Sequence, residues 1–187
     1  TYYSSVDFPE GVNMSFSSIN LKGQDFKETH ILSFVSPSSQ SLANLRASLS
    51  GEKLENYLDL VGPIVENVRV SAGNATQVYN AEQFYPIGQV WGFKVKSKHF
   101  PKFSQAFAKL MQTFKAPGFV GLANITHGIS NGENLLIYGT YPNLNSAFTF
   151  GPKNENEVKA FSVFNDLIGD ISEFTQSWTR VLIKSYE

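Results

Sequence analysis

Residues Gln89–Lys96 read QVWGFKVK, and this stretch decides the fold because its side chains alternate. Trp91, Phe93 and Val95 fall on one side of an extended chain, whereas glycine and lysine occupy the intervening positions. A period of two residues predicts a strand with one buried face. The aromatic side of this strand therefore needs a second layer to cover it.

An amphipathic helix is predicted directly after this strand. His99-Phe100-Pro101 places a proline at a first helical position. Apolar residues then form one helix face with the spacing 3–4–3–1–3, at Phe100, Phe103, Phe107, Leu110, Met111 and Phe114. Ala116-Pro117-Gly118 ends the helix, so the strand and its covering helix form one continuous segment.

The rest of the second half repeats the alternation of strands and helices. Strands are predicted at Phe119–Ile129 and Asn134–Tyr141, joined by a tight turn at Asn131-Gly132. A helix follows at Asn156–Glu173, and a last strand follows at Trp178–Lys184. The order β-α-β-β-α-β is that of a ferredoxin-like unit, an antiparallel sheet with two helices on one face.

The first half resembles an incomplete copy of this unit. Predicted strands at Val12–Leu21 and Thr29–Ser36 come in the same order as the central strands of the second half, and Pro37 ends one strand as Pro142 ends another. A helix stripe runs from Leu54 to Val65, with a break expected at Gly62-Pro63. We therefore predict a partial β-β-α-β unit at 1–86 and a complete unit at 87–187.

In this register the first copy lacks an opening strand and helix. Either about 25–30 residues precede Thr1 or the first unit is a degenerate β-β-α-β module. Similar local patterns without any duplication are the third interpretation. A missing opening strand would expose a sheet edge that a partner could fill.

Two such units in one chain resemble the dimeric α+β barrel superfamily, whose members include proteins similar to antibiotic-biosynthesis monooxygenases. The resemblance rests on element order and on the proline that ends the third strand. It implies an α+β fold in which two antiparallel ferredoxin-like sheets pack as a barrel. It also implies association through the sheets, with another copy of the chain or with another protein subunit. Because that superfamily also holds haem-degrading and isomerase-like enzymes, the fold alone does not select a function.

Composition excludes several classes of protein. The formal net charge is −1, which argues against a general nucleic-acid-binding protein. No apolar run is long enough for a transmembrane helix. Because the chain has no cysteine, disulfides, thiol catalysis and cysteine-based metal sites are ruled out. Three N-x-[ST] sequons, at Asn13, Asn74 and Asn124, slightly favour a secreted or periplasmic protein.

His127 is the candidate catalytic base, because it shares the strand parity of Phe119, Ala123 and Ile125 and should point to an apolar face. The other two histidines, His30 and His99, stand at element boundaries. The three are widely spaced and no carboxylate lies at ligand spacing, so we predict no metal site and no cofactor. The sequence leaves open whether a single histidine holds a haem.

A set of aromatic residues and one amide could bind a small hydrophobic ligand. The resemblance implies a cavity between sheet and helices that binds flat apolar substrates. It also implies that the substrate itself reduces oxygen and that polar groups of the protein orient the substrate. Core packing is the alternative role of these aromatic side chains. The predicted ligand-binding residues are Trp91, Phe93, Asn124, Tyr138, Tyr141 and Trp178.

Two functional hypotheses follow, and the sequence leaves open whether the chain is an enzyme. The first is a non-catalytic binding and assembly module, because no acid–base pair, metal cluster or activated nucleophile is found. The second is a cofactor-independent monooxygenase-like or haem-handling enzyme, with an apolar pocket around Trp91, His127, Tyr138 and Trp178. A pocket with polar groups reaching into it favours the second, and a filled core favours the first.

Overall fold

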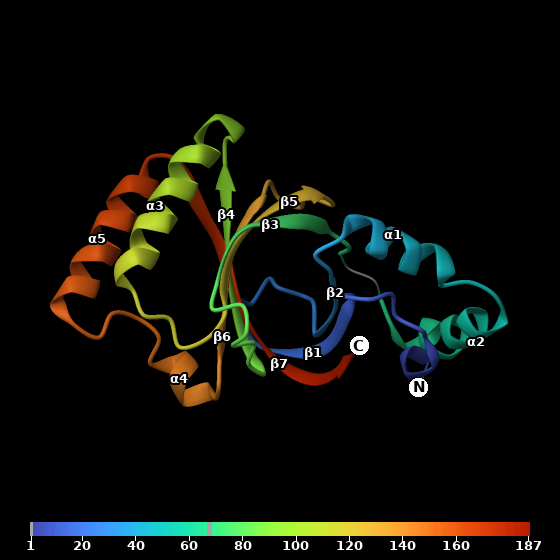
Figure 1. Ribbon diagram of the computed structural model, residues 1–187. Helices are drawn as coiled ribbons and strands as arrows, with labels where there is room; N and C mark the ends of the chain where they lie inside the picture. Colours follow the sequence, from blue (N-terminus) through green and yellow to red (C-terminus); the bar gives the residue numbers. More distant parts are fainter. Residues whose placement is uncertain (1, 67–68) are drawn as a thin grey trace. The chain divides into compact units, whose positions relative to one another are not determined.

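The computed structural model of the chain describes residues 2–66 and 69–187 (Figure 1). Its contacts divide these residues into two compact units, one with residues 2–19, 27–66 and 182–187 and the other with 20–26 and 69–181. Every strand pair with a described register is antiparallel. The predicted α+β class with antiparallel strands is therefore confirmed.

The second unit contains five strands in the order β7-β4-β6-β5-β3. Its elements are β3 (Ala72–Tyr79), β4 (Ile87–Val95), the 3₁₀ helix η3 (Ser97–His99), α3 (Phe100–Thr113), β5 (Val120–His127), β6 (Leu135–Tyr141), α4 (Leu144–Phe148), α5 (Glu155–Gly169) and β7 (Ser172–Tyr186). The last residues of β7 belong to the first unit. From β4 to β7, the strands and long helices follow the predicted β-α-β-β-α-β order.

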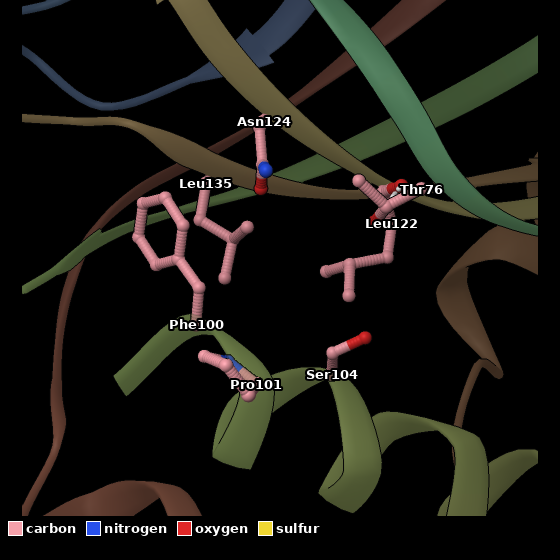
Figure 2. A pocket seen from close by; sticks show the side chains of 7 residues that line it. All are labelled: Thr76, Phe100, Pro101, Ser104, Leu122, Asn124 and Leu135. Carbon is pink, nitrogen blue, oxygen red and sulfur yellow. Dashed lines mark hydrogen bonds between the residues drawn. The ribbon is translucent and has the colours of Figure 1, made fainter. Parts of the chain in front are cut away.

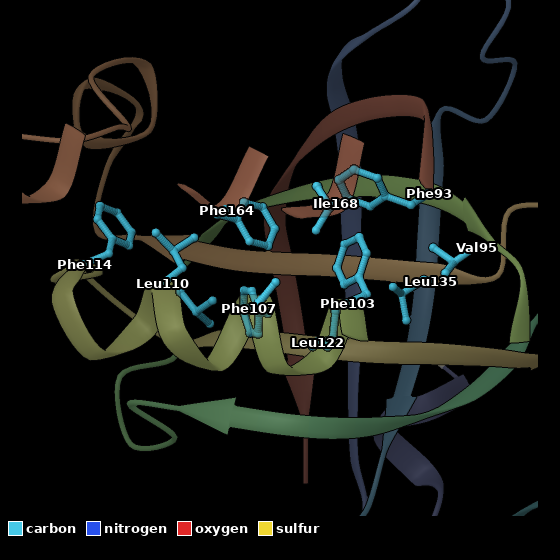
Figure 3. Packing of buried hydrophobic residues seen from close by; sticks show 12 residues of the cluster. Phe93, Val95, Phe103, Phe107, Leu110, Phe114, Leu122, Leu135, Phe164 and Ile168 are labelled. Carbon is cyan, nitrogen blue, oxygen red and sulfur yellow. The ribbon is translucent and has the colours of Figure 1, made fainter. Parts of the chain in front are cut away.

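The helices α3 and α5 lie side by side on one face of this sheet (Figure 1). Phe103 and Phe107 of α3 are fully buried, and Phe164 of α5 packs edge-on against Phe103 with 5.8 Å between ring centroids (Figure 3). Each such side chain contributes about 1.5–3 kcal/mol by leaving water. The apolar stripe predicted for the helix after β4 thus forms the centre of the core.

The hairpin between β5 and β6 turns where Asn-Gly predicts it. Asn131 and Gly132 have φ angles of 54° and 76°, and Ser130 bridges to Glu133 across the turn. Positive φ at both central residues is the geometry of the tight hairpin turn that Asn-Gly favours. This turn brings Glu133 back over the sheet.

The first unit pairs two strands and adds two helices. Its elements are η1 (Tyr2–Ser5), β1 (Asn13–Lys22), β2 (His30–Val35), α1 (Ser39–Ser48), α2 (Glu52–Val61) and η2 (Gly62–Ile64). The register of β1 and β2 runs from Asn13 opposite Val35 to Ser18 opposite His30. Helix α2 ends immediately before Gly62-Pro63, as predicted, because proline cannot continue the helical hydrogen bonds.

Several elements differ from the sequence prediction; α5, for example, ends at Gly169 and not at Glu173. Helix α1 was not predicted, because its serine-rich sequence has a weak apolar stripe and buries only Leu45. Strand β3 begins at Ala72, whereas the terminal strand of the first half was expected from Val68, which lies outside the described residues. Strand β7 begins at Ser172, six residues before the predicted Trp178.

Candidate functional site

A cavity of about 170 Å³ opens between the sheet of the second unit and the first turns of α3 (Figure 2). Strands β3, β5 and β6 form one wall, and α3 forms the other. Its lining residues are Thr76, Phe100, Pro101, Ser104, Leu122, Asn124 and Leu135. The volume is close to that of a cavity of about 150 Å³ that holds one benzene molecule. The cavity therefore has the size of a single aromatic ring.

The position of the cavity follows from how α3 covers the sheet. The large side chains Phe103 and Phe107 point into the centre of the interface, whereas the smaller Ser104 faces the outer strands. Gln77 of β3 donates through Nε2 to the carbonyl oxygen of Ser104 at 2.8 Å and to its Oγ at 2.5 Å. These two bonds tie α3 to the outermost strand and keep the space between them open.

Most of the cavity wall is apolar. Leu122 and Leu135 are fully buried and form its floor, while Phe100 and Pro101 close the side at the start of α3. Phe100, Leu122 and Leu135 all point toward the same space in Figure 2. Walls of this kind favour a hydrophobic ligand, because its apolar surface leaves water on binding.

Two polar side chains reach the cavity from opposite walls, Asn124 from β5 and Ser104 from α3 (Figure 2). Within residues 2–66 and 69–187, the Asn124 carboxamide forms no hydrogen bond. The third polar residue, Thr76, already donates its hydroxyl to the Leu122 carbonyl oxygen at 3.1 Å. The Asn124 amide therefore keeps both donors and its acceptor for a ligand.

The lining residues hold no histidine, carboxylate, lysine or tyrosine. The cavity can consequently supply hydrogen bonds and apolar contact, but its walls contain no group that exchanges a proton near neutral pH. Any proton that a ligand releases has to leave through the cavity mouth.

Of the predicted ligand-binding residues, Asn124 lines the cavity, and three others lie on the same face of the sheet but inside the packed core. Trp91 packs against Phe150 with ring centroids 4.9 Å apart, and Phe93 packs against Phe103 at 5.2 Å. Tyr141 is fully buried beside the same Phe150, and burial raises the pKa of its phenol. These three aromatic rings fill the space between sheet and helices.

Tyr138 and Trp178 lie on the opposite face of the sheet, since both are cross-strand partners of Val90. Arg180, which is 4% exposed, donates to the Tyr138 hydroxyl through Nε at 3.0 Å and through a second guanidinium nitrogen. Burial raises the pKa of Tyr138, and the neighbouring Arg180 offsets part of that rise. The predicted aromatic set is thus divided between two faces.

His127 lies at the end of β5, where its ring is exposed and its Nδ1 is 3.0 Å from the Thr126 hydroxyl. We expected an apolar environment from its strand parity, but β5 runs past the covered part of the sheet before it reaches this residue. His127 is not among the cavity residues. The structure therefore separates the predicted base from the predicted amide.

The sequence prediction missed six of the cavity residues: Thr76, Phe100, Pro101, Ser104, Leu122 and Leu135. Phe100 and Ser104 are four residues apart in the helix and share a face, which the helical period could have indicated. Thr76 could not have been found, because β3 was not predicted to continue to that position.

The described residues contain no cluster of side chains that could hold a metal ion, and the cavity does not fit a haem. No group of three histidine, aspartate or glutamate side chains in this part of the chain could hold a metal ion. A cavity of one-ring size without a lining histidine does not fit a porphyrin. Among the helices in the described ranges, none has both the length and the apolar character needed to cross a bilayer.

Comparison with protein-family models and with curated proteins gives no match. Three solved structures share the fold at low sequence identity. A candidate monooxygenase from Fusobacterium nucleatum is 12% identical with a TM-score of 0.57, and the match covers 94% of this chain and 78% of that chain. An anthrone oxidase-like protein is 14% identical with a TM-score of 0.57 and coverage of 96% and 80%, and a candidate monooxygenase from Lactobacillus acidophilus is 14% identical with a TM-score of 0.58 and coverage of 98% and 85%. The chain therefore shares its α+β fold with these three proteins.

Proposed function

We propose that this chain binds a one-ring phenol in the cavity at the start of α3 and oxidises it with O₂, in the manner of a cofactor-independent monooxygenase. The observation that carries the proposal is an apolar cavity of about 170 Å³ into which the Asn124 carboxamide points without a partner. The names of the three structural neighbours support the oxygenase chemistry, which is the second of our sequence-based hypotheses.

The size of the cavity argues for one ring. A volume close to the benzene-sized reference of about 150 Å³ leaves no room for three fused rings of the anthrone type. Drug-sized ligands occupy pockets of about 300–1,000 Å³. A phenol with small substituents is the oxygen-bearing aromatic molecule that fits.

The arrangement of the walls fixes the orientation of the ring. The aliphatic floor of Leu122 and Leu135 faces the ring carbons, while the free carboxamide of Asn124 faces the phenol oxygen. A buried hydroxyl without a hydrogen bond would cost about 1–3 kcal/mol. The phenol therefore binds with its oxygen toward Asn124, whose NH₂ group stabilises the negative charge of a phenolate.

The reaction uses O₂ as the oxidant and the ring as the reductant. The phenol proton leaves to solvent, the electron-rich ring gives electrons to O₂, and a carbon–oxygen bond forms para to the phenol oxygen. The O–O bond and the para C–H bond then break, and the second oxygen atom leaves as water with the former ring proton and one proton from solvent. One phenol and one O₂ thus give one para-quinone and one water, with four electrons passing from the ring to O₂.

The test is turnover of phenol and small alkylphenols in ¹⁸O₂, followed by oxygen consumption and by the mass of the quinone. The proposal expects one ¹⁸O atom in the quinone and loss of turnover in Asn124→Leu, with retention in the surface control Asn165→Leu. Phenol binding without turnover would support the non-catalytic binding module instead. Absence of both binding and turnover would reject the cavity as a functional site.

A further inference from the structure

The first unit leaves a helix face and a sheet edge exposed. In the second unit the equivalent helix face and sheet edge are covered by residues of that same unit. The two units can be aligned at one local motif: a strand, then a proline, then an N-cap residue that opens a helix. In the first unit Pro37 precedes Ser38, whose Oγ accepts from the amide of Ser41 at 3.2 Å. In the second unit Pro142 precedes Asn143, whose Oδ1 accepts from Ser146 at 2.9 Å.

This alignment makes β2 the counterpart of β6 and α2 the counterpart of α5. In the second unit, β6 pairs with β5 on one side and with β4 on the other. In the first unit, β2 pairs with β1 and stands at the end of the strand order. The position that β4 occupies beside β6 has no occupant beside β2 among the described residues.

The helices differ in the same way. Helix α5 buries Phe164 and Ile168 against α3, whereas α2 has no buried residue at all. Tyr57 of α2 stacks on Tyr2 with ring centroids 4.9 Å apart, and Leu54 and Val61 of its apolar stripe are half-buried. Leu58 is 52% exposed, and Ile64 just beyond the helix is 81% exposed. Beside α2, the described residues provide only the single turn η1, whose Tyr3 also contacts Tyr57, where α5 has the 14-residue helix α3.

We propose that the first unit binds a partner polypeptide that consists of a β-strand followed by an amphipathic helix. The strand adds to the free edge of β2, and the helix packs its apolar stripe on α2, as β4 and α3 do in the second unit. Strand addition at an open edge and a helix laid on an apolar face are established modes of peptide recognition. Residues 87–113 of this chain provide the template for the length and pattern of this partner.

The three structural neighbours are longer than this chain. The match covers 94–98% of this chain but only 78–85% of theirs, so each of them contains further residues without a counterpart here. A long open edge and an exposed apolar helix face are features that proteins normally keep covered.

The register of the sheet shows which backbone groups of β2 are free. Ile19 donates to the Thr29 carbonyl, so residues 29, 31, 33 and 35 form the hydrogen-bonded pairs with β1. The amides of His30, Leu32 and Phe34 consequently point toward the open edge. Leu32→Pro removes one of these outward donors and leaves the pairing with β1 in place.

The experiment measures binding of a fluorescein-labelled peptide with the sequence of residues 87–113 to the full chain, by fluorescence anisotropy. We expect saturable binding that weakens by about tenfold or more in Leu32→Pro and in Leu58→Lys, since each removes part of the docking surface. Asn56→Lys adds the same charge on the polar side of α2 and should leave the affinity unchanged. Far-UV circular dichroism and thermal melting check that each variant is folded.

Two results would overturn the proposal. One is an absence of saturable binding by a folded wild-type chain. The other is a self-associated chain, seen by sedimentation, that Leu32→Pro converts to monomers while the peptide has no effect, because the edge would then be occupied by a second copy.

Discussion

A carboxylate oxygen of Glu133 occupies the space that a side chain at residue 92 would fill. A Cβ placed on Gly92 would lie 2.0 Å from Oε2 of Glu133. Glu133 is 3% exposed, accepts hydrogen bonds from Thr175 at 2.6 Å and Gln176 at 2.8 Å, and forms an ion pair with Arg69. The glycine within QVWGFKVK is therefore required by a buried charge on the sheet face away from the helices.

Gly92→Ala should lower the free energy of unfolding by about 2–4 kcal/mol, because the methyl group forces a buried carboxylate away from its partners. Chemical denaturation measures the change. Gly23→Ala is the matched control, since no atom lies within 4 Å of its added Cβ, and it should change stability by less than about 0.5 kcal/mol. An equal denaturation midpoint for Gly92→Ala and wild type would refute this role of the glycine.

Tyr138→Phe should destabilise the fold without affecting the cavity. The Tyr138 hydroxyl is the acceptor for two nitrogens of the buried Arg180, and a hydrogen bond to a charged group contributes about 1.5–3 kcal/mol. We expect a loss of that size in urea denaturation at pH 7, with phenol affinity unchanged. A large loss of phenol affinity in a folded Tyr138→Phe protein would instead place the ligand on the other face of the sheet.

Stability should fall as the pH rises above 10, and Tyr141 should contribute to the fall. Burial raises the pKa of its phenol above the ordinary value of 10.0. Below pH 10 the folded and unfolded states both keep this proton; above it the unfolded chain releases the proton first, so the unfolded state is favoured. Tyr141→Phe should therefore reduce the steepness of the loss between pH 10 and 11. Equal slopes for both proteins would contradict this assignment.

Burial also raises the pKa of Tyr3 to about 12, with the neighbouring Tyr57 as the next contribution. Tyr3→Phe provides a second measurement of the same effect in the other unit. Its expected sign is the same, because the proton again stays longer on the folded chain than on the unfolded one.

The alternating pattern in the sequence identified the correct layer for several residues but not the empty space within it. Parity places Trp91 and Phe93 toward the helices, and this is where they lie. Asn124 lies on that side too, although it has the opposite parity to Phe119, Ala123 and Ile125, which we expected to form the apolar face. Which part of the interface stays unfilled depends on side chains from other elements, such as Phe150 against Trp91. The alternation of apolar and polar residues does not show which side chains fill the space between sheet and helices and which leave part of it empty.

Two other placements show where strand parity helps and where it fails. Tyr138 and Tyr141 are three residues apart, so a strand necessarily puts them on opposite faces, and the sequence alone contained this information. The face of Trp178 was not readable in this way, because the register of β4 and β7 shifts at Gly92–Phe93 and changes the parity of the residues beyond it. Register shifts of this kind depend on tertiary pairing.

The central claim, that the Asn124 carboxamide recognises an oxygen atom on a one-ring ligand, is tested most directly by calorimetric titration of phenol and toluene. The account predicts that wild type and the surface control Asn165→Leu prefer phenol by about three- to tenfold. It predicts that Asn124→Leu loses this preference while it keeps its affinity for toluene. An unchanged preference for phenol in folded Asn124→Leu, or no binding of either ligand to wild type, would contradict the account.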